Sequence, residues 1–359
     1  MQPSVIAIHE HVPLAPFTTL GLGGEARYFV ECSSPDQVRA ALTYGSDRRL
    51  PVYILGGGSN VVFPDGGFPG LVLRVTIGGL DYRDGPNPEV TAGAGVDWDT
   101  LVRGAVERGW TGVECLSGIP GTVGGTPIQN VGAYGQEIAE TLMSVTCLDR
   151  TTLERKTFTT RECSFGYRDS RFKHEDRGRY VVLDVTLRLA RDRAPRIRYA
   201  ELGDAVARKT PIETVPPAEA GRLVREAVLA LRRSKSMVLD PVDPNTRSAG
   251  SFFMNPVLAP AAFTKLEQHW REMAQGSGSA IPTFPADGGV KVPAAWLVER
   301  AGFPKGYRRG GAGISSRHAL ALVNFGGTSN ELLTLAESVR DGVEARFGVR
   351  LEFEPEVVG

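Results

Sequence analysis

Ser117–Gly135 reads SGIPGTVGGTPIQNVGAYG, and this segment decides the fold. Its six glycines and two prolines exclude a helix, because glycine and proline are the two poorest helix formers. Apolar residues such as Ile119, Val123 and Tyr134 predict an ordered loop and not a disordered linker. We expect its backbone N–H groups to lie bare, so that successive amides can converge on an anion such as a pyrophosphate. A tight turn between core elements is the alternative that the composition leaves open.

Another glycine cluster, Gly56-Gly57-Gly58-Ser59-Asn60, lies upstream between two apolar runs. Of these two, it is the first glycine cluster along the chain, and Ser117–Gly135 is the second. Pro51–Leu55 before it and Val61–Phe63 after it favour β-structure, so the pattern predicts strand, glycine turn and strand. A Rossmann dinucleotide site needs strand, glycine turn and helix instead. Gly21–Ala26 fits the loose G-x-G-x-x-A pattern, but prolines precede it and Arg27–Val30 after it is typical of a strand. We therefore reject a Rossmann site.

Length and composition restrict the class of protein and the kind of partner further. A chain of 359 residues predicts two or three domains, and 41 basic against 41 acidic residues argue against nucleic acid or an anionic membrane as a partner. Four widely spaced cysteines without a C-x-x-C pair argue against a metal site and a disulfide framework. No signal-peptide pattern and no apolar run near 18 residues, about the length of a membrane span, is visible. We expect a cytoplasmic protein without a metal.

Helix and strand patterns mix along the chain and predict an α+β fold. Helices are predicted to begin at Ser34-Pro35 and at Asp97, and to span Ala218–Ser234, Pro260–Gln275, Pro293–Ala301 and Asn330–Phe347. Strands are predicted at Leu71–Val75, Glu89–Ala92, Thr141–Leu148, Val181–Leu189 and, from its alternation, Val349–Val357. Ala190–Arg198 is predicted to be a surface segment or boundary, and Gly276–Ser279 a short flexible loop.

Several motifs follow one another in a fixed order along the chain: Leu55–Asn60, Gly118–Gly125, Pro127–Gly135, Phe165–Ser170, Ala249–Phe253, Ala294–Leu297 and Glu354–Val357. Their order resembles the UDP-N-acetylenolpyruvoylglucosamine reductase family, flavoenzymes of bacterial cell-wall synthesis. The resemblance runs from about Phe17 to Val357, and an insert that carries Tyr199 is similar to the tyrosine-bearing loop of the family's first type.

The resemblance implies an FAD-binding fold of the PCMH/vanillyl-alcohol-oxidase type in two α+β subdomains, residues 1–70 and 71–235, with the tyrosine loop around 190–215. An α+β substrate-binding domain, 236–348, and a C-terminal strand returning to the active site, 349–359, would follow. Non-covalent FAD and NADPH as co-substrate are implied with it. The cofactor-binding residues that we expect are Gly56, Gly57, Gly58, Ser59, Asn60, Ser117, Gly118, Ile119, Pro120, Gly121, Thr122, Val123, Gly124, Gly125, Asn130, Gly132, Ala133, Tyr134 and Val182.

The family reaction reduces UDP-N-acetylglucosamine enolpyruvate to UDP-N-acetylmuramate in two half-reactions joined by FADH2. Hydride addition leaves carbanion character beside the substrate carboxylate, which calls for a cation at the carboxylate and a proton donor at the carbanion. Arg168 suits the first role, because a guanidinium can bind a carboxylate through two hydrogen bonds. The resemblance assigns proton donation to Ser251 and polarisation of the enolpyruvyl group to Glu356, which can act in its protonated form.

The resemblance also implies the substrate contacts, and it implies no partner beyond substrate and NADPH. Two alternatives stay open: an FAD oxidase of the same flavin-binding fold, and a nucleotide-binding protein without catalysis. We expect a monomer that binds neither nucleic acid nor a membrane. The substrate-binding residues that we expect are Tyr167, Tyr199, Arg232, Lys235, Asn255 and Lys291.

Overall fold

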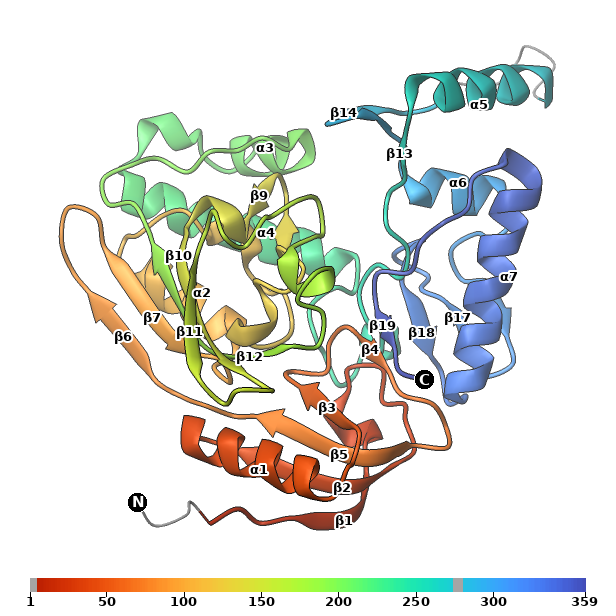
Figure 1. Ribbon diagram of the computed structural model, residues 1–359. Coiled ribbons are helices and arrows are strands. Elements are labelled where there is room, and N and C mark those ends of the chain that lie inside the picture. Colours follow the sequence, from red (N-terminus) through yellow and green to blue (C-terminus); the bar gives the residue numbers. More distant parts are fainter. Residues whose placement is uncertain (1–4, 274–279) are drawn as a thin grey trace. The chain divides into compact units, whose positions relative to one another are not determined.

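A computed structural model describes residues 5–273 and 280–359 of the chain (Figure 1). The chain divides into two compact units, and each unit joins segments that are far apart in the sequence. Unit 1 comprises Met1–Val12, Glu25–Gly58 and Phe68–Val238, and unit 2 comprises Pro13–Gly24, Ser59–Gly67 and Leu239–Gly359. The division into residues 1–70, 71–235, 236–348 and 349–359 stays a prediction. Gly276–Ser279 and the end of the helix predicted to reach Gln275 lie outside the described residues.

The first sheet of unit 1 has the strand order β1-β2-β5-β3, and β5 pairs in parallel with β2 and with β3. Helix α1 begins as predicted, because the Ser34 hydroxyl accepts a hydrogen bond from the Gln37 amide at 3.2 Å and Pro35 occupies the first turn. The elements are β1 (His9–Pro13), β2 (Glu25–Cys32), α1 (Pro35–Asp47), β3 (Val52–Leu55) and β5 (Phe68–Val75). The strands predicted at Pro51–Leu55 and Leu71–Val75 are therefore confirmed.

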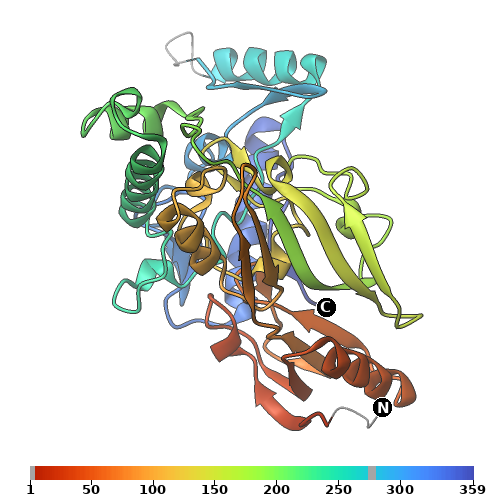
Figure 2. The same cartoon turned by 90° about the vertical axis from the view of Figure 1, so that its left-hand side faces the viewer.

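The second sheet of unit 1 is antiparallel, in the order β11-β10-β12-β7-β6, with the long strands β10 and β12 side by side (Figure 2). Along β12, Val181, Leu183, Val185 and Leu187 are buried, as the alternation predicted. These side chains and those of the first sheet share one hydrophobic core, to which α2 contributes Trp98 and Leu101. The elements are β6 (Leu80–Arg83), β7 (Glu89–Gly93), α2 (Trp98–Glu107), β10 (Leu142–Asp149), β11 (Arg155–Thr159) and β12 (Tyr180–Arg188).

Two parts of unit 1 differ from the sequence prediction. The glycine segment contains a 3₁₀ turn, Val123–Gly125, because three residues can close one such turn without the long hydrogen-bonded run that glycine disfavours. It also contains the short strand β8 (Gly132–Ala133), paired with β9 (Gln136–Glu137). The insert that was predicted only as a surface segment and loop forms helix α3 (Ala200–Ala207), which packs with the predicted helix α4 (Pro217–Ser234).

Unit 2 is built around helix α7 (Ser329–Phe347), which covers a small antiparallel sheet. At its start, the Thr328 hydroxyl accepts a hydrogen bond from the Glu331 amide, and the Glu331 side chain accepts one from the Thr328 amide. At its end, Gly348 adopts the left-handed conformation, with φ +66°. The sheets are β16 (Arg308–Arg309), β17 (Ala312–Ile314) and β18 (Leu322–Asn324), and β13 (Val257–Leu258), β15 (Gly289–Lys291) and β14 (Phe284–Ala286). The other predicted helices of this unit are present as α5 (Pro260–Met273) and α6 (Ala294–Arg300).

The strand predicted at Val349–Val357 is wrong over most of its length. Only β19 (Glu356–Val357) is a strand, and it pairs in parallel with β4 (Val61–Val62). The alternation nevertheless has a structural basis, since Val349, Leu351 and Pro355 are buried. The segment finds a partner backbone at only a few of its residues.

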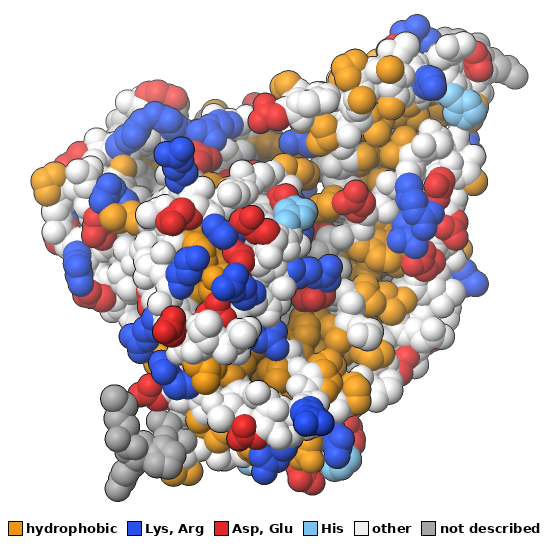
Figure 3. Space-filling view, viewed as in Figure 1, with side chains coloured by type: hydrophobic (Ala, Val, Ile, Leu, Met, Phe, Trp, Pro, Cys, Tyr) orange, Lys and Arg blue, Asp and Glu red, His pale blue; other side chains and the backbone are white. Residues whose placement is uncertain are grey.

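Several further features bear on the class of protein. Among residues 5–273 and 280–359, no helix is long and apolar enough to cross a membrane, and no group of three His, Cys, Asp or Glu side chains could hold a metal ion. All four cysteines are buried as free thiols, and burial raises the pKa of Cys32 and of Cys163 to about 12. Basic and acidic side chains are interspersed over the face shown in Figure 3.

Candidate active site

The two glycine clusters meet at Gly57 and Gly121. A Cβ atom added at Gly57 would lie 2.6 Å from the Gly121 Cα atom and 3.0 Å from the Thr122 amide nitrogen, closer than side chains approach. Gly121 has φ +119° and Gly58 has φ +63°, conformations that L-residues with a Cβ rarely adopt. Glycine is therefore required here so that one backbone can pack directly on the other.

The expectation of bare amides throughout the second cluster is wrong for several of its residues. The Gly118 amide donates to Asp99 Oδ1 at 2.6 Å, and the Gly124 amide donates to the Ala94 carbonyl at 2.9 Å. The Val123 and Gly125 amides also donate within the protein. Buried amides need acceptors, so these donors hold the loop in shape and are unavailable to a ligand.

Other amides at the junction of the clusters fit an anion. In the described part of the chain, the amides of Gly57, Gly58 and Gly121 have no protein acceptor. A Cβ atom at Gly125 would meet nothing within 4 Å, so space adjoins the loop. Amide donors without a protein acceptor suit the pyrophosphate of a dinucleotide, and the residues present therefore fit FAD. The predicted contact Val182 is buried on β12, whose Leu183 carbonyl accepts from the Ala94 amide next to this loop at 2.8 Å.

Asp99, at the start of α2, fixes the glycine loop to two helices. Its carboxylate accepts hydrogen bonds from both Nη atoms of Arg225 on α4, at 2.6 and 2.7 Å, and one from the Gly118 amide. Burial by itself raises the pKa of Asp99, but the hydrogen bonds from Arg225 and Gly118 outweigh burial, and the pKa lies below its usual range. Sequence reasoning missed this pair because nothing local connects residues that far apart in the chain.

Arg168 lies in a tight turn with strained backbone. The turn Gly166–Asp169 is closed by two backbone hydrogen bonds, Gly166 to Asp169 at 3.0 Å and the reverse at 3.2 Å. Arg168 itself has φ +54°, which is uncommon for a long side chain and occurs often at functional sites. Its guanidinium donates to the Gly132 carbonyl at 2.6 Å, so the predicted catalytic cation lies against the second glycine cluster.

Asn130, predicted to bind the cofactor, holds the Arg168 turn in place with its side chain. Its Nδ2 donates to Glu137 Oε2 at 2.7 Å and to the Gly166 carbonyl at 2.9 Å, while its Oδ1 accepts from the Ala139 amide at 3.1 Å. The residue is 1% exposed and has φ +47°. Both side-chain donors are thus engaged within the protein.

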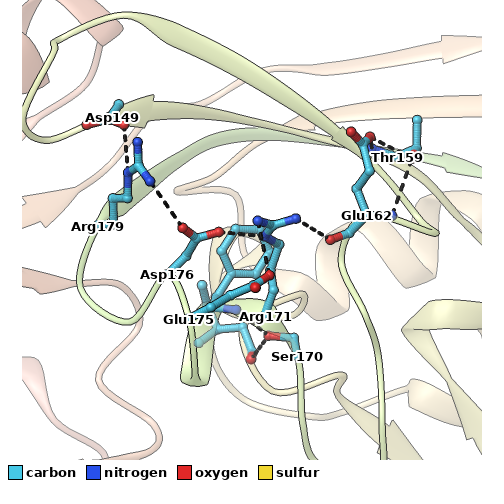
Figure 4. A network of polar contacts seen from close by, with 10 residues as sticks. Asp149, Thr159, Glu162, Ser170, Arg171, Glu175, Asp176 and Arg179 are labelled. Atoms are coloured by element: carbon cyan, nitrogen blue, oxygen red, sulfur yellow. Dashed lines mark hydrogen bonds and ion pairs between the residues drawn. The ribbon is translucent and has the colours of Figure 1, made fainter.

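A network of charged side chains supports the chain that follows this turn (Figure 4). The Ser170 hydroxyl donates to the Ile128 carbonyl in the glycine segment. Arg171 donates to Asp176 Oδ2 at 2.5 Å and to the Glu162 carbonyl at 2.7 Å. Several local contacts therefore fix the backbone on the C-terminal side of Arg168.

Ser251 and Glu356 are positioned by a backbone ladder in unit 2. The Met254 amide donates to the Glu352 carbonyl and the Glu354 amide to the Phe252 carbonyl, both at 2.9 Å. The rings of Phe252, Phe253 and Phe353 pack edge-on beneath this ladder, with centroids 5.3–5.7 Å apart. Ser251 precedes one strand of the ladder and Glu356 follows the other.

Glu356 also adjoins the first glycine cluster. Its amide donates to the Asn60 carbonyl at 3.0 Å, and Asn60 Nδ2 donates to the Glu354 carbonyl at 3.2 Å. The Glu356 residue is exposed. Ser251 Oγ lies 3.3 Å from Nε2 of His318, a residue that stands in none of the motifs.

Arg232, an expected substrate contact, is nearly enclosed in unit 1. It is 8% exposed, its Nη2 donates to the Met237 carbonyl at 2.8 Å, and its Nε has no partner within the described residues. Burial lowers the pKa of its guanidinium. The Nε atom lies 3.6 Å from the position of a Cβ added at Gly118, so this cation faces the glycine loop.

Lys235 and Tyr199 lie at the helix that the insert forms. Lys235 Nζ donates to Glu201 Oε2 at 2.6 Å, and Glu201 lies in the first turn of α3, which Tyr199 precedes. The half-exposed Tyr199 ring meets the ring of Tyr134 edge-on at 5.8 Å. Burial raises the pKa of Tyr134 to about 12. Two expected substrate contacts and one expected cofactor contact are thus brought together.

The remaining expected contacts are also placed. Asn255 Oδ1 accepts from the Ala294 amide at 2.8 Å and thereby caps the start of α6. Lys291 on β15 pairs with Val257 on β13. Val257 follows Asn255 closely in the chain. Tyr167 is 38% exposed beside Arg168, whose guanidinium carbon lies 5.6 Å from its ring centre.

Comparisons with known proteins agree with this geometry. A family model for an FAD binding domain matches residues 26–153, and one for the C-terminal domain of UDP-N-acetylenolpyruvoylglucosamine reductase matches residues 240–358. The chain is similar to the reductase of that name from Thermobifida fusca, at 49% identity over 97% of each chain. The Mycobacterium tuberculosis reductase is 45% identical over 98% of this chain and 95% of its own.

A solved structure shows the same likeness. The UDP-N-acetylenolpyruvylglucosamine reductase of Thermus caldophilus superposes with a TM-score of 0.68 at 25% identity, over 99% of this chain and 100% of its own. Fold and site together define an FAD-dependent oxidoreductase with an α+β fold. The chain belongs to the UDP-N-acetylenolpyruvoylglucosamine reductase family. This membership decides against the two alternatives, an oxidase and a nucleotide-binding protein without catalysis.

Proposed function

We propose that the protein reduces UDP-N-acetylglucosamine enolpyruvate to UDP-N-acetylmuramate with NADPH, in peptidoglycan synthesis, by a ping-pong reaction through non-covalently bound FAD. The observation that carries this proposal is near-full-length similarity to reductases of one name, at 44–49% identity. The chain also presents a cation, a hydroxyl and a carboxylate at the motif positions the reaction needs. When bound, the flavin accepts hydride from NADPH and supplies it to the substrate.

The chain holds the cofactor through its backbone in this proposal. The amides of Gly57, Gly58 and Gly121 would donate to the pyrophosphate, and the other expected cofactor residues lie in the same two clusters, except Val182 on β12. Asp99 keeps the loop in shape through the Gly118 amide. Since this mode of FAD binding uses no covalent bond, we expect acid precipitation to release the flavin into the supernatant. Flavin that stays with the precipitate would contradict non-covalent binding.

The three catalytic residues divide the work on the substrate. Arg168 binds the substrate carboxylate, next to which negative charge develops, and its fixed contact with Gly132 aligns the guanidinium. Glu356 polarises the enolpyruvyl group alongside Arg168. Ser251 donates its hydroxyl proton to the carbanion carbon.

The expected substrate-binding residues bind the UDP moiety of the substrate in this proposal. Tyr199 covers the nucleotide from its loop, while Lys235, Asn255, Lys291, Arg232 and Tyr167 contact diphosphate and sugar. The protein would act as a cytoplasmic monomer without a nucleic-acid or membrane partner. Its zero net charge and the interspersed charges on the face in Figure 3 argue against nucleic acid or an anionic membrane as a partner.

Stopped-flow measurement of the two half-reactions tests the proposal. Ser251→Ala should leave bleaching of the flavin by NADPH near normal, because that step forms no substrate carbanion. Reoxidation by the enolpyruvyl substrate should slow by about 100-fold or more, the scale for loss of a positioned acid. Ser251→Cys should recover part of the rate, since a thiol can also supply a proton.

The exposed serine at the end of α4 provides a control, and Ser234→Ala should alter neither half-reaction. If Ser251→Ala slows both half-reactions equally, the serine supports the flavin or the fold and the proton comes from another group. Wild-type flavin that NADPH bleaches but that the enolpyruvyl substrate does not reoxidise would refute the proposed reaction.

A further inference from the structure

We propose that His318 is a positioning residue for Ser251, which orients the serine hydroxyl for proton donation and stabilises the oxygen as its proton leaves. This inference rests on the proposed function, because it needs Ser251 to be the proton donor. It starts from one contact, the 3.3 Å between Ser251 Oγ and His318 Nε2.

The second ring nitrogen determines the direction of that contact. The Leu320 amide donates to His318 Nδ1 at 3.3 Å, so Nδ1 carries no proton in this arrangement. A neutral imidazole whose Nδ1 is unprotonated carries its proton on Nε2. His318 is therefore the donor and Ser251 Oγ the acceptor, and the serine keeps its own O–H proton for another partner.

The backbone fixes the two residues beside each other. The Phe252 amide donates to the Leu320 carbonyl at 2.8 Å, which joins the residue after Ser251 to the residue whose amide binds the imidazole. Phe252 is fully buried and Leu320 nearly so. The His318 carbonyl accepts from the Ala321 amide at 3.2 Å, which closes the turn that carries the ring.

This arrangement gives His318 two effects on the proton transfer. Since its N–H occupies a lone pair of Oγ, it restricts the directions in which the Ser251 O–H can point. During the step, the carbanion electron pair takes the serine proton, a C–H bond forms, and Oγ is left with negative charge. A preplaced N–H donor stabilises that charge. Water then returns a proton to Oγ, so the imidazole itself stays neutral throughout.

Two conservative substitutions separate this role from a structural one. His318→Asn places an amide oxygen near the position of Nδ1 and keeps an acceptor for Leu320, but its shorter side chain cannot donate to Ser251. His318→Gln places an amide NH2 near the position of Nε2 and keeps a donor for Ser251. A purely structural histidine would be replaced better by asparagine, and a positioning histidine better by glutamine.

We expect His318→Asn to slow reoxidation of reduced flavin by the enolpyruvyl substrate by about 10-fold or more, and His318→Gln to stay within about threefold of wild type. Bleaching by NADPH and the Kd for substrate, measured from the flavin spectrum, should change little in either variant. Equal slowing of both half-reactions, or slower reoxidation with glutamine than with asparagine, would overturn the proposal.

A double-mutant cycle tests whether His318 acts through Ser251. In the Ser251→Ala protein, His318→Asn should cause no further slowing, because the hydroxyl that it positions is gone. Further slowing of about 10-fold would show that the histidine acts elsewhere. Failure of the two proposals is distinguishable: if Ser251→Ala alone leaves reoxidation unchanged, the assignment of the proton donor is wrong. If Ser251→Ala slows reoxidation but His318→Asn does not, only the role of His318 is wrong.

Discussion

The regions around Arg168 and around Ser251 and Glu356 are positioned by different kinds of contact. Side-chain hydrogen bonds and ion pairs hold the Arg168 turn and the chain that follows it in unit 1. A backbone ladder over buried aromatic rings holds Ser251 and Glu356 in unit 2. The first arrangement depends on individual polar atoms and the second on packed volume, so different substitutions should disturb each of them.

The largest effect should come from the glycine junction. Gly57→Val would place a side chain where the Gly121 backbone lies, force the clusters apart and abolish flavin retention. The ratio of flavin to protein after gel filtration measures this loss. In Gly85→Ala the new Cβ meets nothing within 4 Å, so this control should retain flavin like the wild type. Full flavin content in Gly57→Val would contradict the close approach of the clusters.

Removal of an aromatic ring should disturb the Ser251 region next most strongly. Phe353→Ala leaves a cavity against Phe252 and Phe253, and we expect the free energy of unfolding to fall by about 3 kcal/mol. Denaturant titration of the flavin-free protein measures it. Phe284, in β14, is half-exposed, so Phe284→Ala should cost well under 1 kcal/mol. Similar losses in both variants would show that the rings under the ladder do not form a tight core.

Loss of polar contacts should disturb the Arg168 region. Asn130→Ala removes three side-chain hydrogen bonds, and we expect a loss of about 2 kcal/mol in the free energy of unfolding. Since one of these bonds holds Gly166, reoxidation by the enolpyruvyl substrate should slow as well. Asn330→Ala, at the exposed start of α7, is the control and should change neither value. Normal reoxidation in Asn130→Ala would show that the turn keeps its place without this side chain.

The sequence was sufficient for most helices and strands, because their signals are local. Ser34-Pro35, Asp97 and the prolines before α4 mark helix starts through caps and fixed φ values, and β12 shows a simple alternation. The strand predicted from the alternation in Val349–Val357 is wrong over most of its length, because alternate side chains can be buried without a partner strand.

The sequence selects candidate site residues only where a motif marks them. Arg168, Ser251 and Glu356 stand in motifs, and their catalytic roles stay predictions. The sequence could not select Asp99 and His318, because their side chains contact residues that are distant in the sequence. The sequence also could not show which glycine amides are occupied, since their acceptors belong to other elements.

The smallest effect that we predict belongs to Asp99, the polar contact that supports the glycine loop. Asp99→Asn keeps the shape of the side chain and an acceptor for Gly118 but removes the charge paired with Arg225. We expect a loss of about 1 kcal/mol in the free energy of unfolding at pH 7. Asp47→Asn, an exposed carboxylate at the end of α1, should change it little.

The pH dependence identifies the cause of that loss. The pKa of Asp99 is lowered in the folded protein, so its contribution is fully present above the pKa of the unfolded chain, about 4. It disappears as the pH falls through the lower, folded pKa, where the wild-type carboxyl also becomes neutral. The difference between wild type and Asp99→Asn in the free energy of unfolding should therefore be constant from pH 7 to about 5 and shrink below about pH 4. A difference that stays the same at acidic pH would show that the loss in Asp99→Asn does not come from the charge of the carboxylate.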